Sequence, residues 1–457
     1  MSDSLETHIN LLVADYLRSK GLIRTVETFE QETNRPLLHN VSKLDENLVS
    51  IVTDRVDFLR LKEKYSSDDN FERVYTPQQL ALIKRSNLKL SNWTPVVPKN
   101  RSILHIAGNN KSLIINSSYW KFGESNLGVF INSEKSLFLV DLNSEEVIFS
   151  VAKHHGTSNI KLAIGIPESD VVLTFGMNGT VFVNKFENNM FTVLQELVLH
   201  ARLISDAKYL PIDEKSGYIC SIGWDFKVKV TKIEIGPSTK LTHIGEYKLM
   251  TNASCLECFW FKESAFVAVG RLETSTLSLI LIEQERIVEL AKLPLNDSEF
   301  SNHSFQPMSM VQFQEGDNHL LSIATNHVPF MRIITIILPN LDTLLEEAPG
   351  LPTSTEQLFT SSVPMLRDII VSNLNSFSPQ DKYSSAQILK RPVPNQGLWI
   401  VGDDGKIRGM DLKSGEIVKE EDTHEGRIKS SFVGSDDINP EILVTSGAVD
   451  RRVVIFR

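Results

Sequence analysis

A short motif that recurs along the chain limits the possible folds more than any other feature of this 457-residue sequence. Each copy has a histidine, a β-branched run with a serine or threonine, a polar turn at Asp or Asn, and a second apolar run. Such runs separated by turn residues are typical of antiparallel strands. The four complete copies are His155, Thr174 and Asn178; His200, Ser221 and Asp225; His303, Ser322 and Asn326; and His424, Ser446 and Asp450.

The spacing of the copies indicates a repeating unit of four strands. The histidine precedes the turn residue by 23, 25, 23 and 26 residues in the four copies. Asn178 and Asp225 are 47 residues apart, and Asp404, whose turn has Ile400 in the hydroxyl position, precedes Asp450 by 46 residues. Repeats of about 40–50 residues are typical of β-propellers, in which each repeat forms one four-stranded blade.

The turns predict a mainly β fold, a seven-bladed propeller over residues 91–457. They are placed near Ser133, Asn178, Asp225, Glu273, Asn326, Asp404 and Asp450. The long step between the fifth and sixth turns predicts an insertion at about 341–382, in which Met365 to Leu374 is expected to form a short amphipathic helix. Only three strands follow His424, so the segment near Trp93 to Ile106 is expected to supply the fourth strand and close the ring.

These repeats resemble the WD-repeat family of β-propellers. In that family a histidine, a serine or threonine and a turn aspartate form a buried hydrogen-bonded set within a blade. The resemblance implies this structural role for the twelve residues of the four copies. The match is degenerate, because Asn178 and Asn326 replace the turn aspartate and Trp224-Asp225 lies at a turn and not at a blade end.

A helical module precedes the propeller. Apolar residues between Ile9 and Leu17 recur on one helical face, Gly21 is expected to end this helix, and a second short helix carries Val26 and Phe29. Two helices this short cannot bury a self-sufficient core. A partner is therefore expected, either a second copy of the chain or the rest of the same chain.

The helical pair also resembles the LisH motif, over about Leu5 to Thr33. The matching residues are Leu12-Val13, Tyr16-Leu17, Gly21, Thr25, Thr28-Phe29 and Glu32. LisH modules are dimerisation helices, so the resemblance implies a homodimer through a hairpin at residues 1–35. The residues expected at that contact are Ile9, Leu12, Val13, Tyr16, Leu17, Gly21, Val26 and Phe29.

Residues 36–90 are expected to form a helical extension and linker. Leu44 to Lys64 has a short heptad-like stripe of apolar residues, which fits either a coiled coil or packing on the hairpin. Thr76-Pro77-Gln78-Gln79 predicts a further helix start, with Thr76 as N-cap, and this helix is expected to run to about Ser86.

Composition limits the partners and the compartment. The net charge of −10 disfavours direct nucleic-acid binding, and no apolar run reaches the length of about 18 residues that a membrane span needs. Three cysteines are too few for a disulfide framework, which predicts an intracellular site in the cytoplasm, the nucleus or both. Cys255 and Cys258 form a C-x-x-C without a second ligand pair, so neither a metal nor a cofactor is expected.

The recurring Ser, His and Asp do not predict a hydrolase. Catalysis needs one activated nucleophile, whereas equivalent copies in successive strands and turns are typical of a structural network. We therefore expect a non-enzymatic scaffold or adaptor that dimerises through the LisH module and binds other proteins of a multisubunit complex. Two alternatives stay open, a subunit or substrate receptor of a ubiquitin ligase complex and a chromatin-associated co-regulator, and the acidic charge disfavours the second.

Overall fold

The computed structural model divides the chain into two compact units, Met1–Val74 and Tyr75–Arg457, which are described separately. It describes residues 2–33, 47–49, 51–53, 75–90, 93, 98, 100–106, 112–236, 238–284, 286–296, 305–338, 341–347, 363–381, 384, 387–392 and 397–457. Most of the helix predicted at Leu44 to Lys64 lies outside these residues.

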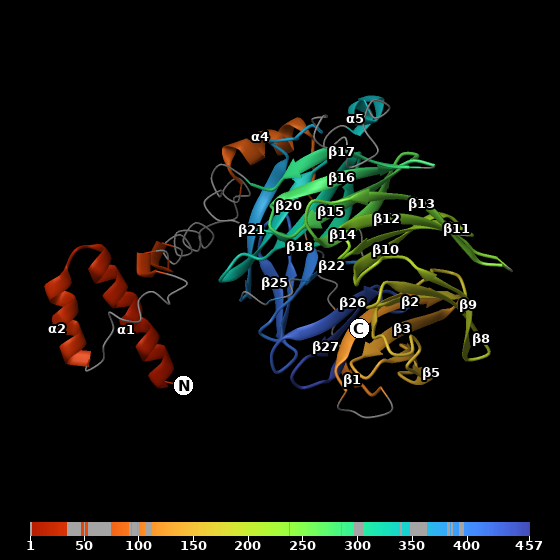
Figure 1. The fold of residues 1–457 in the computed structure, drawn as a ribbon, viewed down its shortest axis with the longest axis horizontal. Helices are drawn as coiled ribbons and strands as arrows, with labels where there is room; N and C mark the ends of the chain where they lie inside the picture. Colours follow the sequence, from red (N-terminus) through yellow and green to blue (C-terminus); the bar gives the residue numbers. More distant parts are fainter. Residues whose placement is uncertain are drawn as a thin grey trace. The chain divides into compact units, whose positions relative to one another are not determined.

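The first unit contains the predicted helical hairpin, made of α1 (Ser2–Ser19) and α2 (Ile23–Thr33) (Figure 1). Gly21 ends α1 with a φ of 74°, a left-handed conformation that glycine adopts without strain. The Leu22 N–H donates to the Leu17 carbonyl at 3.0 Å and the Gly21 N–H to the Arg18 carbonyl at 2.9 Å, the bond pattern of a Schellman cap. This reversal brings the two helices side by side.

The second unit is a propeller of seven four-stranded antiparallel sheets within the described residues. Blade 1 comprises β2 (Ile114–Phe122), β3 (Ser125–Asn132), β4 (Ser136–Asp141) and β5 (Val147–Ala152). Blade 2 comprises β6 (Ile160–Gly165), β7 (Val171–Gly176), β8 (Thr180–Glu187) and β9 (Met190–Val198). Blade 3 comprises β10 (Ile204–Asp213), β11 (Ser216–Gly223), β12 (Lys227–Glu234) and β13 (Lys240–Lys248).

Blades 4 to 7 complete the ring. Blade 4 comprises β14 (Ala253–Phe261), β15 (Ser264–Arg271), β16 (Thr276–Ile282) and β17 (Ile287–Pro294). Blade 5 comprises β18 (Pro307–Glu315), β19 (Asn318–Thr325), β20 (Phe330–Ile337) and β21 (Ile370–Pro379). Blade 6 comprises β22 (Gln387–Lys390), β23 (Leu398–Val401), β24 (Lys406–Met410) and β25 (Ile417–Asp422). Blade 7 comprises β26 (Ile428–Gly434), β27 (Ile442–Gly447), β28 (Val453–Phe456) and β1 (Arg101–Leu104).

The order of the strands confirms the seven predicted blades. The first strand of each blade contacts the first strand of the next, from β2 round to β26 and back to β2. All seven predicted turns fall between the second and third strands of a blade. Those middle strands are the most buried, and every residue of β7 and of β27 lies inside the propeller. The core therefore lies in the layers between neighbouring blades.

The strand β1 closes the ring, as the sequence predicted. It pairs antiparallel with β28, from Arg101 opposite Phe456 to Leu104 opposite Val453. Just beyond this ladder, the backbone N–H groups of Asn100 and Arg457 each donate to the other residue's carbonyl at 2.9 Å. The pairing removes the open edge that β28 would otherwise present.

The chain before β1 lies along blades 5 and 6. The helix α4 (Pro77–Arg85) starts at Thr76 with the predicted cap, in which Thr76 and Gln79 exchange hydrogen bonds, and it packs on β21. The Tyr75 hydroxyl donates to the Lys413 carbonyl at 3.0 Å in blade 6. The Trp93 N–H donates to Asp411 Oδ2 at 2.6 Å in the same blade.

One prediction for the insertion is wrong. Met365 to Leu374 does not form a helix, because Ile370–Pro379 is β21, the fourth strand of blade 5. A β-branched run at Ile369, Ile370 and Val371 has spacing that fits either structure, and the unpaired edge of β20 decides for the strand. The described residues of this insertion do include a helix, α5 (Leu341–Glu347), which follows β20.

Candidate functional site

The predicted histidine sets are hydrogen-bonded inside the blades. In blade 3, His200 Nδ1 lies 2.9 Å from Asp225 Oδ1, and its Nε2 lies 2.9 Å from Ser221 Oγ. The His200 side chain is completely buried. Burial lowers the pKa of His200 below its usual value and outweighs the opposite effect of Asp225. This set ties β11 and the turn after it to the segment before β10, and it offers no exposed nucleophile.

The equivalent sets in blades 2 and 5 differ in detail. His155 Nε2 lies 2.8 Å from Thr174 Oγ1, but its Nδ1 reaches Asn178 only through Thr180, whose hydroxyl donates to Asn178 Oδ1 at 2.7 Å. His303 of the blade 5 set lies outside the described residues. The other two members of that set do not bond to each other: the Ser322 hydroxyl pairs with Thr335, and Asn326 accepts from the Gln306 N–H.

The predicted serine of blade 7 is not the partner of its histidine. His424 Nδ1 lies 3.0 Å from Asp450 Oδ2, as expected, but Nε2 lies 3.0 Å from Thr445 Oγ1. Ser446 Oγ is instead 2.7 Å from Ser430 Oγ. The turn after β27 is one residue longer than the turn after β11, since Thr445 pairs with Val454 whereas Ser221 pairs with Lys229. Counting back from the aspartate therefore selects the wrong hydroxyl.

Two buried polar groups, one inside blade 6 and one between blades 6 and 7, were not found by sequence reasoning. Arg408, with 4% of its side chain exposed, donates to Asp404 at 2.5 Å, and so takes the place that histidine has beside the turn aspartate in blades 3 and 7. Arg391 and Glu441 form an ion pair at 2.6 Å with 0% and 1% of their side chains exposed. Isolated Arg and Glu residues carry no sequence signal for such pairing. Among the described residues, no group of His, Cys, Asp or Glu has the arrangement of a metal site.

The hairpin residues predicted for dimerisation are divided between an internal core and the surface. Val26 is fully buried beside Ala14, which the motif reasoning missed, and Leu17 and Phe29 pack against this pair. Leu12 is 6% exposed, Val13 and Tyr16 are partly exposed, and Gly21 forms the cap between the helices. Large apolar side chains also lie at the surface of the hairpin, about half exposed: Ile9, Leu22 and Ile23.

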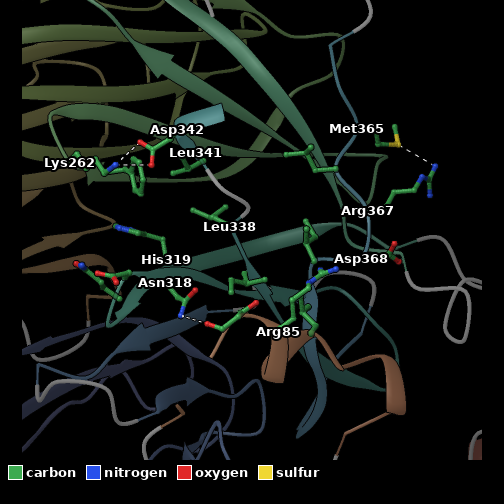
Figure 2. Close-up of a pocket in the computed structure, with 18 residues that line it drawn as sticks. Arg85, Lys262, Asn318, His319, Leu338, Leu341, Asp342, Met365, Arg367 and Asp368 are labelled. Atoms are coloured by element: carbon green, nitrogen blue, oxygen red, sulfur yellow. Dashed lines mark hydrogen bonds and ion pairs between the residues drawn. The ribbon is translucent and has the colours of Figure 1, made fainter. Parts of the chain in front are cut away.

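A groove of about 1020 Å³ lies in the propeller unit where blades 4 and 5 meet (Figure 2). It is bordered by α4, α5, the β14–β15 and β18–β19 turns and the segment before β21. Its floor is apolar, with Leu338, Leu341 and Ile369 almost entirely buried. A cavity of this size is comparable to those that bind ligands or peptide side chains.

One wall of the groove is fixed by polar contacts. Lys262 Nζ lies 2.7 Å from both carboxylate oxygens of Asp342 and so ties the β14–β15 turn to α5. The Asn318 side-chain amide donates to the Ser86 carbonyl at 3.1 Å and ties the β18–β19 turn to the end of α4. His319 stacks edge-on against Phe261, with ring centres 5.3 Å apart, and burial lowers its pKa below the usual value. These contacts preform the groove, and the His319 imidazole that lines it is uncharged at neutral pH.

The opposite wall is a short segment, residues 363–369, which we call the strap. Its Pro364 carbonyl accepts from the Lys292 N–H at 2.9 Å, and its Leu366 N–H donates to the Lys292 carbonyl at 2.9 Å. Met365 therefore forms a parallel bridge with Lys292 of β17, the outer strand of blade 4. Sequence reasoning placed an insertion here but could not foresee the groove, because its walls come from elements far apart in the chain.

Comparisons with known proteins agree with this architecture. Residues 77–457 match a family described as UCP007778, beta-propeller domain, and residues 8–33 match LisH. A curated relative from Saccharomyces cerevisiae, Uncharacterized protein YGR117C, is 25% identical over 475 residues, with 94% of each chain covered. None of the described helices is long and apolar enough to cross a membrane.

Proposed function

Because the chain belongs to the UCP007778 beta-propeller domain family and carries a LisH match ahead of that domain, we propose that it is a non-enzymatic scaffold that brings partner proteins together. The observation that carries this proposal is the pairing of a helical hairpin with exposed apolar residues and a propeller with an open, preformed groove. The recurring His, Ser, Thr and Asp residues support the non-enzymatic part of the proposal, because they bond to one another inside the blades.

Dimerisation through the hairpin is the second part of the proposal. Ala14 and Val26 are the fully buried side chains of its small cluster, too few to sustain a fold alone. Ile9, Leu22 and Ile23 are between 47% and 49% exposed, so a second hairpin has apolar surface to cover. A dimer would double every propeller surface, and two linked contacts to a divalent partner bind more tightly than one. Such a protein would serve as one subunit of a larger complex.

The site of action is proposed to be intracellular. Cys220, Cys255 and Cys258 are all buried and unpaired. Burial raises the pKa of the Cys255 thiol to about 12, so this side chain is protonated and unreactive at neutral pH. Buried thiols of this kind fit a reducing compartment, in which disulfides are not needed for stability.

Light scattering on the full chain tests the dimer. The wild type is expected at twice the 51.5 kDa chain mass, and the double variant Ile9→Lys with Ile23→Lys is expected at the single mass. Both substitutions replace side chains that are about half exposed, so the hairpin core is retained. The matched control is Ile438→Lys on the propeller, where the side chain is 88% exposed, and it is expected to stay dimeric. A monomeric wild type would refute dimerisation.

A further inference from the structure

The strap extends the outer edge of blade 4 by a single parallel β-bridge. It pairs with Lys292 on the outer strand β17 through two backbone hydrogen bonds, at 2.9 Å each. Strands at the edge of a sheet have unpaired N–H and C=O groups that accept a further strand. In this molecule the edge of blade 4 is extended by a segment from the insertion of blade 5.

The strap in turn has an edge of its own. Since Pro364 and Leu366 use their carbonyl and N–H to bond Lys292, the N–H and C=O of Met365 between them point to the opposite side. Neither group has a hydrogen-bond partner among the described residues. The Met365 side chain is 47% exposed. Within the described part of the chain, the backbone edge at Met365 is therefore unpaired.

This edge borders the groove. Figure 2 shows Met365, Arg367 and Asp368 on one side of the cavity, with Lys262 and His319 on the other and Leu338 between them. The floor at Leu338, Leu341 and Ile369 is apolar, so it suits an apolar side chain and no charged one.

The charges around the groove are balanced. The cationic residues of its lining are Arg85, Lys262 and Arg367, and the anionic ones are Asp317, Asp342 and Asp368. Burial keeps His319 uncharged at neutral pH. Charge therefore gives no preference for an acidic or a basic ligand, and backbone pairing and apolar contact would supply the affinity.

We propose that the groove binds an extended, largely uncharged peptide segment of a partner protein, which pairs with the backbone of Met365 as an added strand and places an apolar side chain on the groove floor. Strand addition of this kind draws affinity from main-chain hydrogen bonds and specificity from a side-chain pocket. The inference rests on the proposed scaffold function and names the kind of partner that the propeller takes.

A library of random nonapeptides displayed on phage supplies the probe, selected against the immobilised full chain. Enriched peptides are expected to be apolar and uncharged at their centre and to bind with micromolar Kd in fluorescence polarisation. Raising the salt from about 50 to 500 mM should change Kd less than about threefold, because the lining has no net charge. Hydrogen exchange of the Met365 amide should slow at least tenfold when such a peptide is bound.

Substitutions at the edge separate backbone pairing from side-chain contact. Met365→Pro removes the free N–H and is expected to weaken binding at least tenfold, whereas Met365→Ala keeps the N–H and should stay within about threefold of the wild type. The matched control is Val193→Pro on β9, the outer strand of blade 2, where the Val193 side chain is 45% exposed and so is similar to Met365. It should leave the Kd unchanged. Exchange of the Lys292 amide reports whether the strap of each variant is still paired with β17.

The decisive readout is the Met365 amide in the wild type. If no selected peptide slows its exchange, or if Met365→Pro binds as well as Met365→Ala while Lys292 stays protected, strand addition at the strap is refuted. The hairpin is not involved in this test. A monomeric chain that still binds the peptide would refute dimerisation and leave the groove proposal standing.

Discussion

The buried ion pair between blades 6 and 7 allows the sharpest test of how this propeller is held together. Arg391 donates to Glu441 through Nη2 at 2.6 Å and through Nε at 2.9 Å, and the Trp399 indole N–H donates to the same carboxylate at 2.5 Å. The Arg391 guanidinium also lies 3.7 Å from the ring centre of Trp93. Glu441→Gln keeps the size of the side chain but removes the negative charge.

The expected loss of stability follows from this burial. Removing one partner of a buried ion pair costs about 3–5 kcal/mol, because the remaining charge has been taken out of water without compensation. The face of Trp93 offsets part of that loss, since a desolvated cation–π contact contributes about 2 kcal/mol. We therefore expect Glu441→Gln to lower the free energy of unfolding by about 3 kcal/mol. Urea unfolding followed by tryptophan fluorescence measures this, because Trp93 and Trp399 lie in the same cluster.

A matched exposed pair provides the control. Glu246 bonds Lys227 at 2.5 Å on blade 3, but 40% of its side chain is exposed, so Glu246→Gln is expected to cost less than about 1 kcal/mol. Equal losses in Glu441→Gln and Glu246→Gln would refute the reasoning, because they would show that the Arg391 charge is not desolvated. The double variant Arg391→Met with Glu441→Leu should recover most of the loss, since no buried charge is left unpaired.

Two further predictions concern the histidine sets. Burial lowers the pKa of His155 from 6.5 to about 4. As the pH falls below 6.5, the imidazole therefore takes up a proton in the unfolded chain but not in the folded one. By pH 5 this difference should lower the free energy of unfolding by about 2 kcal/mol. His155→Gln should flatten the decline of the urea midpoint between pH 7 and pH 5, and an unchanged slope would contradict this. In blade 7, Thr445→Val should shift the NMR titration of His424 and Ser446→Ala should not, whereas the reverse result would restore the serine as the histidine's partner.

The features predictable from the sequence are those encoded by neighbouring residues. A turn aspartate such as Asp225, four residues after a serine in a β-branched run, is local information, and it recurs often enough to reveal the blades. The N-cap at Thr76 is equally local, since its partner Gln79 lies three residues away. The need for a fourth strand in blade 7 followed from the rule that sheet edges are not left open. Each of these features appears in the structure.

The errors and omissions have the opposite origin. Counting four residues back from Asp450 predicts Ser446 as the partner of His424. The length of the turn decides which hydroxyl faces His424, and it selects Thr445. The sequence predicts a helix that overlaps the start of β21, and it cannot predict the strand because the need of β20 for a partner is a property of the sheet. The groove escaped prediction entirely, since Arg85, Lys262 and Met365 come together only when three distant segments meet. A site that is formed by such non-local contacts leaves no regular pattern in the sequence.

The pairing of β1 with β28 also sets an order of events during translation. The ribosome makes β1 before every other strand of the propeller, and its partner β28 after all of them. The ring therefore cannot close until the last blade has left the ribosome, and for that whole interval β1 has no partner strand. The hairpin is complete much earlier, by Thr33, so the dimerisation proposed above would have time to take place before either propeller closes. An assembly of this protein would then be decided at its N-terminus while its binding surfaces are still being made.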